Sequence, residues 1–415
     1  MLTRPTKSAR MPIPDKLVSC WHKQTVSLPP IAYLAGGKIR LKLEGESSRT
    51  IESQYGNTIR ERSVKAQQRH SWKTEGSSFL SGSVLWGKGA SDPSAIRITT
   101  TSLCRGTAAG QFLYALETDH SCGLLAVDNF GSEERRVWSN NTQRLRHIST
   151  HQGHVACSVE QKFGTANIGV MLADGSGLSE VTEGDSLDTA PRWVPGEKRQ
   201  IVFQSAGVGR DRDGNFGGLG PFAIQKLDLD SGEMNTLVED DAYDSLVPQM
   251  TADGTLYYIQ RPHTTGREFS FPQFIKDFFL FPFRLLFAIF QYLNFFSMIY
   301  TGKKLTTAGG AKAREMDLKQ MMIWGNMVRA TNRPHTEAPD LVPNSWKLMR
   351  KREGDDAQEL AASVLSYDVC PDGSIIYTNG SAIFHLTQDG KSTRLLTDDL
   401  IEQVAVLENP LQRNP

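Results

Sequence analysis

The sequence has few of the residue patterns that reveal a chemistry directly. Its five cysteines are scattered and never spaced as C-x-x-C, which argues against a disulfide framework or a zinc ribbon. This usage indicates a reducing compartment with small, mostly buried thiols. Lys plus Arg and Asp plus Glu number 46 each, so no basic field attracts nucleic acid. Residues 1–30 contain no apolar run of signal-peptide length, and we therefore expect a cytoplasmic protein.

Two further absences narrow the fold class and the activity. Helical periodicity is confined to one region, and elsewhere short apolar runs of strand length are separated by Gly, Asp, Asn and Ser. Examples of these runs are Ile168–Leu172, Gln200–Gln204 and Ala382–Leu386. No G-x-S-x-G nucleophile elbow is present, which argues against a hydrolase domain.

The strand-like runs repeat in a fixed order. Units begin near residues 188, 244 and 364, and in each of them an inner strand leads into a tight turn. The turns are Pro195-Gly196, Asp253-Gly254 and Pro371-Asp372-Gly373. A second strand, a third strand and a polar outer strand follow. Self-similarity of this kind indicates a repeat architecture, in which stacked units bury each other's faces.

The turns carry a resemblance to a known family. Pro191–Gly196 (PRWVPG) and Val369–Gly373 (VCPDG) resemble the WD-repeat-like units of TolB-type propellers, which read P-x-W-S-P-D-G-K followed by a strand and D-x-D-G-G. The resemblance covers residues 165–260 and 363–400. It implies an all-β fold, a β-propeller of about seven four-stranded blades with six or eight also compatible, and a bacterial protein.

The blades are expected at residues 31–55, 57–89, 92–140, 143–185, 187–240, 243–362 and 363–397. The first of them lacks an inner strand, whereas the run Ile401–Leu407 follows a complete unit. We therefore predict that Ile401–Leu407 pairs beside Ile31–Leu43 and closes the ring non-covalently. Four parts result: an N-terminal arm (1–29), the first part of the propeller (30–260), a hydrophobic helical insertion (261–345), and the last part with the closing strand (346–415).

The insertion interrupts the penultimate blade. Its core, Phe269–Tyr300, is rich in phenylalanine, and Phe278–Tyr300 is long enough to cross a bilayer. The strands on both sides belong to one blade and must lie on one side of any membrane, so a single crossing is excluded. Polar residues form one narrow stripe at helical spacing, which predicts a helix lying in the membrane interface. The stripe consists of Gln273, Asp277, Arg284, Gln291 and Asn294.

The apolar remainder of that helix is the predicted surface for contact with a membrane or a partner. Its residues are Phe274, Phe278, Phe279, Phe283, Leu286, Phe287, Phe290, Phe295, Phe296 and Tyr300. A shorter amphipathic stretch follows, from Met316 to Val328. Two alternatives remain open, namely that the insertion joins two copies into a homodimer or that it covers a face of the propeller.

Three groups of residues invite a chemical interpretation. Gly82–Gly89 nearly matches a phosphate-binding P-loop, but Gly89 replaces the Mg²⁺-binding hydroxyl, and we interpret it as a strand that ends in a glycine turn. His147, His151 and His154 are the right residue type for zinc, although they fall on a predicted strand and its turn. Asp211, Asp213 and Asn215 alternate like the first ligands of a Ca²⁺ loop, but the distal glutamate is missing.

The leading hypothesis from the sequence is a non-catalytic scaffold that binds protein partners and is held at the inner face of the membrane by the insertion. No catalytic residue, cofactor or nucleic-acid partner is predicted; Ca²⁺ remains the one candidate ligand. The alternative is a metal-dependent hydrolase that uses the central channel. Strictosidine-synthase-like and lactonase propellers resemble this chain in carrying a late hydrophobic insertion, but none of their metal or catalytic residues can be matched here. Tightly held metal in the purified protein would favour the enzyme.

Overall fold

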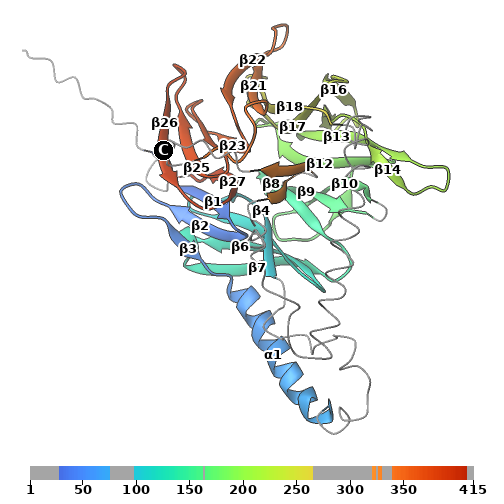
Figure 1. Cartoon of the computed structure of the whole chain (residues 1–415), viewed down its shortest axis with the longest axis vertical. Coiled ribbons are helices and arrows are strands. Elements are labelled where there is room, and N and C mark those ends of the chain that lie inside the picture. Colours follow the sequence, from blue (N-terminus) through green and yellow to red (C-terminus); the bar gives the residue numbers. More distant parts are fainter. Residues whose placement is uncertain are drawn as a thin grey trace, which may run out of the picture.

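The computed structural model of the chain describes residues 28–74, 98–161, 164–264, 320–323, 326–329 and 339–408. Its strands form four sheets of four strands each, a sheet of nine strands that contains two more such units, and a separate sheet of two strands. Within the described residues this gives six four-stranded blades arranged around a centre (Figure 1). The predicted all-β propeller is therefore confirmed, and six blades lie within the described residues.

The blades are numbered along the chain, and in each of them the strand named first lies at the central channel. Blade 1 contains β27 (Ile401–Val406), β1 (Ile31–Ala35), β2 (Lys38–Lys42) and β3 (Arg49–Ile51). Blade 2 contains β4 (Ile98–Arg105), β5 (Phe112–Thr118), β6 (Cys122–Asp128) and β7 (Glu133–Asn140), with the 3-10 turn η3 (Asn129–Gly131) before β7. Blade 3 contains β8 (Leu145–His151), β9 (His154–Glu160), β10 (Ala166–Leu172) and β11 (Ser179–Glu180).

The second half of the ring is built in the same way. Blade 4 contains β12 (Ser186–Trp193), β13 (Gln200–Arg210), β15 (Ala223–Asp228) and β16 (Met234–Val238), and β14 (Phe216–Leu219) extends β13 into a hairpin. Blade 5 contains β17 (Tyr243–Met250), β18 (Leu256–Pro262), β21 (Lys347–Lys351) and β22 (Gln358–Ala362). Blade 6 contains β23 (Ser366–Val369), β24 (Ile375–Thr378), β25 (Ala382–Leu386) and β26 (Ser392–Thr397).

The prediction of a blade at residues 57–89 is wrong for residues 57–74, the part of this range that the structure describes. Residues Gln54–Thr74 form the helix α1, which points away from the sheets in Figure 1. This segment is dominated by Arg, Gln, Lys and other straight-chain residues, which favour a helix over a half-buried strand. Its first turn is fixed by a cap, because the Ser53 hydroxyl accepts the amide of Gly56, and Glu134 of β7 accepts the amides of Gln54 and Tyr55.

The non-covalent closure of the ring is confirmed. β27 pairs antiparallel with β1, with Ile31 opposite Val406 and Leu34 opposite Gln403. The C-terminal strand thus becomes the innermost strand of the first blade. Ile401, Val404 and Ala405 are fully buried, which places β27 in the core on both of its faces.

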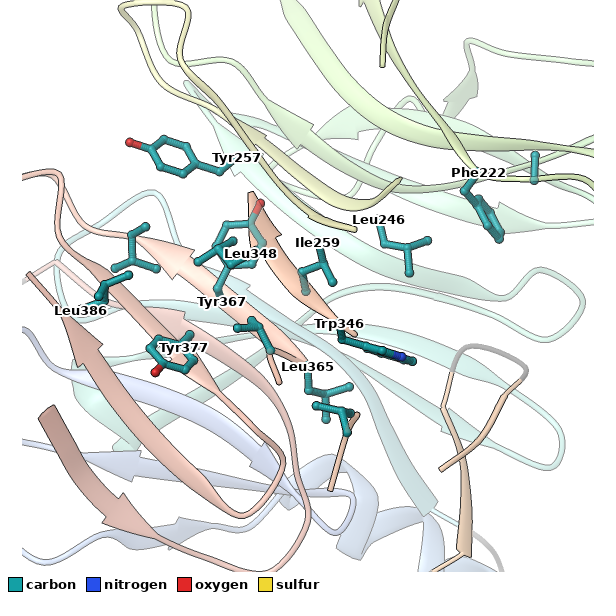
Figure 2. Packing of buried hydrophobic residues seen from close by; sticks show 14 residues of the cluster. Phe222, Leu246, Tyr257, Ile259, Trp346, Leu348, Leu365, Tyr367, Tyr377 and Leu386 are labelled. Atoms are coloured by element: carbon teal, nitrogen blue, oxygen red, sulfur yellow. The ribbon is translucent and has the colours of Figure 1, made fainter. Parts of the chain in front are cut away.

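One apolar cluster fills the space between each pair of neighbouring blades. Figure 2 shows the cluster between blades 5 and 6, where side chains of both sheets meet, and this cluster extends to Phe222 next to β15 of blade 4. Leu348 and Tyr367 lie at its centre and are both 0% exposed. The other junctions hold separate clusters, so burial of apolar surface is distributed around the whole ring.

A hydrogen bond from side chain to backbone also crosses every junction. In each case a side-chain oxygen of one blade accepts an amide N–H from the inner strand of the next. From blade 1 onwards, the acceptors are Gln403 for Leu103, Ser102 for Ile148, Ser149 for Trp193, Gln204 for Val247, Gln249 for Val369, and Asp368 for Val406. Gln249 and Gln403 also donate to a backbone carbonyl across the same junction.

The predicted insertion leaves and re-enters blade 5 between two strands that are hydrogen-bonded to each other. β18 pairs with β21, with Leu256 opposite Lys351 and Gln260 opposite Lys347. Most of the insertion, including the Phe-rich core, lies outside the described residues. Within it, β19 (Gln320–Ile323) and β20 (Asn326–Arg329) form a hairpin, so the shorter stretch expected as an amphipathic segment of the helical insertion is β-structure there.

Removal of the closing strand tests the ring closure. We expect a chain that lacks residues 400–415 to lose its cooperative melting transition, because the clusters on both sides of β27 become exposed. A chain that ends at Glu408 keeps β27 and should melt like the full-length protein. Circular dichroism of both truncations decides the point, and a preserved transition in the shorter one would show that closure is not needed.

The contribution of the bonds across the junctions can be measured at Gln249, which is 8% exposed. Replacement Gln249→Leu leaves the Val369 amide and the Tyr367 carbonyl without their partner. We expect the free energy of unfolding to fall by about 1–3 kcal/mol. The control Gln358→Leu, on the exposed strand β22, should change it by less than about 0.5 kcal/mol in the same urea titration. Equal effects of the two substitutions would contradict a special role of the junction.

Candidate functional site

The inner strands enclose two cavities that meet at Arg192. The first cavity, of about 500 Å³, is lined by the amino-terminal halves of these strands and by residues such as His147, Val247 and Glu402. The second, of about 570 Å³, is lined by their carboxy-terminal halves and by the turns that follow them. Arg192 lines both cavities, so its side chain lies where the two ends of the central channel join.

The wall of the first cavity is built from bulged backbone. Strands β8, β12 and β17 each break register near the middle, and a residue with positive φ stands at each break. These residues are His147 (φ 50°), Ala190 (φ 53°) and Val247 (φ 51°). A side chain in this conformation costs about 1–3 kcal/mol, and for a β-branched residue it is rare. The same strain in three consecutive blades indicates that the surrounding bonds, such as that of the Val247 amide to Gln204, impose it.

His147 is held in its neutral form at this wall. Burial, together with the positive charges of Arg146 and Arg192, lowers the pKa of His147 from 6.5 to about 3. Its Nδ1 lies 3.3 Å from the Ser158 hydroxyl. Arg146 is itself paired with Glu117 and Glu160. A proton therefore does not reside on this histidine at neutral pH.

The second cavity is bordered by the turns that carry the sequence resemblance. Pro195, Asp253 and Asp372 belong to these turns and line it together with Trp193. The carboxylates are engaged locally, because Asp253 accepts the amide of Thr255 and Asp372 accepts the amide of Ser374. The motif thus builds the rim of the cavity, and its acidic residues stabilise their own turns.

Two thiols at the second cavity are not activated. Cys104 and Cys370 line it, and burial raises the pKa of each to about 12. A reactive cysteine needs a lowered pKa, so neither thiol is prepared for nucleophilic attack. The four cysteines that the structure describes are free and buried, as their scattered positions predict.

The structure does not bring the three candidate histidines together. His147 faces the first cavity, whereas His151 and His154 face each other across the turn between β8 and β9. His151 Nε2 donates to the Gly196 carbonyl, and both rings lie about 6 Å from the ring of Trp193. Among the described residues, no group of three or more His, Cys, Asp or Glu side chains is placed to hold a metal ion.

The other sequence candidates differ in how far the structure describes them. Asp211, Asp213 and Asn215 lie in the hairpin turn between β13 and β14, where the Asp211 carboxylate accepts the amides of Asp213 and Asn215. Both bonds go to one oxygen of the Asp211 carboxylate, and the Asn215 side-chain amide donates to the other. The P-loop-like segment Gly82–Gly89 and the Phe-rich contact surface, from Phe274 to Tyr300, lie outside the described residues. No helix in the part of the chain with described coordinates is long and apolar enough to span a membrane.

The residues at the channel, above all Arg192 and Glu402, were not singled out from the sequence. Arg192 was part of the motif PRWVPG but was used there only as evidence for the fold. The available signal was a charged residue within a predicted inner strand, namely Arg192 near the end of β12 and Glu402 near the start of the closing strand.

The strand order, the closing strand and the central channel define the class of this protein as a closed β-propeller. No protein-family model matches the sequence, and no curated protein matches it.

Solved structures similar to this chain include two described as TolB. TolB from Acinetobacter baumannii has 12% identity and a TM-score of 0.48, with 92% of this chain and 67% of that chain covered. A TolB structure from Agrobacterium tumefaciens has 13% identity and a TM-score of 0.40, with 73% and 82% covered. A nidogen–laminin complex has 7% identity and a TM-score of 0.48, with 91% and 98% covered. The propeller fold that the sequence resemblance implies is confirmed by the arrangement and closure of the sheets.

The neutral state of His147 makes stability depend on pH. Folded His147 remains unprotonated down to about pH 3, whereas in the unfolded chain it binds a proton below pH 6.5. Acid therefore favours unfolding, and stability should fall below pH 6.5 by up to about 1.4 kcal/mol per pH unit from this residue. When the pH falls from 7 to 5, the free energy of unfolding of the variant His147→Asn should decrease by about 1–2 kcal/mol less than that of the wild type, as measured by urea titration. Asparagine tolerates positive φ, so the backbone is preserved. Equal losses would contradict the buried neutral histidine.

Proposed function

We propose that this protein is a non-catalytic propeller scaffold that binds a protein partner and is attached by its Phe-rich insertion to the cytoplasmic face of a membrane. The fold offers two faces and a channel for binding. The observation that carries the proposal is the pairing of β18 with β21, which joins the two ends of the insertion within one sheet. Blade 5 thus has its four strands without any contribution from residues 265–338.

The two segments that connect the insertion to β18 and β21 are held by contacts within the propeller. On the departing side, the Asp244 carboxylate is buried and accepts hydrogen bonds from Arg261 and His263. The Arg261 guanidinium lies 5.1 Å from the centre of the Trp346 ring, which belongs to the returning side. These contacts hold both ends of the insertion on the propeller, so a membrane-bound insertion would keep the propeller at the membrane.

The returning segment is fixed to the neighbouring blade. The Leu341 amide donates to the Asn379 carbonyl, and the Ser381 hydroxyl donates to the Pro339 carbonyl. Asn379 and Ser381 belong to the turn between β24 and β25. This turn lies at the end of the channel where the first cavity opens, because Thr378 of β24 pairs with Ser366, which lines that cavity. The insertion therefore emerges on the face of the first cavity, and a membrane bound there would face that cavity.

The channel chemistry supports binding rather than catalysis. In the first cavity, burial lowers the pKa of His147 to about 3, and in the second, burial raises the pKa of Cys104 to about 12, so both groups are neutral at pH 7. The hydrolase alternative would need metal ligands, and the described residues contain no such cluster. An oligogalacturonate lyase in complex with manganese is among the similar structures, but its likeness covers 41% of this chain at a TM-score of 0.29 and carries no argument.

Flotation with liposomes tests the anchor. The full-length protein should rise with vesicles of phosphatidylethanolamine and phosphatidylglycerol, because aromatic residues and Lys303 and Lys304 suit the headgroup region. A variant that lacks residues 268–335 should remain at the bottom of the gradient. Because β18 and β21 still pair, its melting temperature should stay within a few degrees of the wild type.

Each result of this experiment has a clear meaning. Failure of the full-length protein to float would overturn the membrane proposal, and flotation of both proteins would show that another surface binds the vesicles. If the full-length protein stays in solution as a dimer that the deletion converts to a monomer, the insertion is instead a homodimer interface. Sedimentation analysis of both proteins provides that readout.

A further inference from the structure

Almost all polar side chains around the first cavity have partners within the protein. Arg146 is paired with Glu117 and Glu160, and Gln403 binds both backbone groups of Leu103. The remaining Ser, Thr and His side chains of the wall are also hydrogen-bonded. Polar groups at such a wall are normally satisfied in this way, so an exception is informative.

Arg192 and Glu402 are the two exceptions in the described part of this wall. Both are half-buried, and neither side chain makes a hydrogen bond or an ion pair with another described residue. Arg192 follows the bulge in β12, and Glu402 is the second residue of β27. They line the same cavity of about 500 Å³ but do not pair with each other.

Both groups face the channel rather than bulk solvent. The charge of Arg192 acts electrostatically on Cys104, His147 and Tyr367, which belong to blades 2, 3 and 6, so its guanidinium lies among the inner strands. Burial raises the pKa of Glu402 above its usual value, as expected for a carboxyl group without a cationic neighbour. A half-buried charge without a partner is unfavourable, and a ligand of opposite charge would relieve that cost.

We propose that the first cavity binds a small zwitterionic molecule, with its carboxylate on Arg192 and its ammonium group on Glu402. A guanidinium can hold a carboxylate through two parallel hydrogen bonds, and a glutamate can accept those of an ammonium group. Arg192 belongs to the inner strand of blade 4 and Glu402 to that of blade 1, and both line one cavity, so a single ligand that carries both charges would satisfy them together. Amino acids and short peptides have this chemistry. The site lies in the propeller and does not depend on the membrane proposal.

Calorimetric titration of the full-length protein with a graded series of ligands tests the site. The series consists of glycine, 4-aminobutanoate, 6-aminohexanoate and alanyl-alanine, in which the distance between the two charged groups differs. Acetate and ethylammonium carry one charge each. We expect at least one zwitterion to bind about tenfold or more tightly than either single ion, since only it satisfies both residues.

Variants identify the residues that bind. Arg192→Gln and Glu402→Gln should each weaken binding of the preferred zwitterion about tenfold or more. Arg192→Lys should give a smaller loss, because it keeps the charge but not the planar fork. The exposed controls Arg199→Gln and Glu353→Gln should leave affinity unchanged. Melting curves without ligand verify that each variant is folded, and if Arg192→Gln does not fold, Arg192→Lys and Glu402→Gln carry the test.

The proposal fails if no member of the series binds at millimolar concentration. It also fails if acetate binds as tightly as the zwitterions, which would leave an anion site on Arg192 alone. Retention of full affinity in the folded Glu402→Gln or Arg192 variants would equally overturn it.

Discussion

The inner strand of each blade has one edge that pairs with no other strand of the blade. The hydrogen bonds that cross each junction satisfy backbone amides at that edge. A buried backbone amide needs a partner, and here a side chain of the preceding blade supplies it at all six junctions. The blades are therefore held at the channel by polar bonds and farther out by the apolar clusters between the sheets. β27 takes part in both, since its Gln403 reaches β4 and its Val406 amide reaches Asp368.

These bonds also shape the channel. The Ile148 amide reaches Ser102 directly after the bulge at His147, and the Val247 amide reaches Gln204 within the bulge of β17. The bulges lie in the wall of the first cavity, and the junction bonds offset the strain in these strands. Among the described residues, Arg192 and Glu402 of this wall have no hydrogen-bonding or ionic partner.

The sequence was sufficient to predict the strands and turns of the propeller wherever a local pattern repeats. The turns after the inner strands, the strands of blades 4 to 6 and the pairing of β27 with β1 were predicted, because apolar alternation and Asp-Gly turns depend on neighbouring residues. Residues 54–74 were misassigned because strand spacing alone was extended over a segment whose side chains favour a helix. The cap of that helix could not be foreseen, since Glu134 lies 80 residues from Gln54 along the chain.

The sequence by itself determined the class of fold and the place of the apolar insertion. Hydrophobic periodicity and turn residues can be recognised in short stretches of the sequence. The last predicted strand follows a complete unit and could therefore be assigned to the first blade, which lacked an inner strand. Only the tertiary structure decided what stands at the channel. His147, Arg192 and Glu402 come from three blades and line one cavity. Burial lowers the pKa of His147, with the charges of Arg146 and Arg192 acting in the same direction, and burial raises the pKa of Glu402. Their chemistry therefore exists only once the ring has closed.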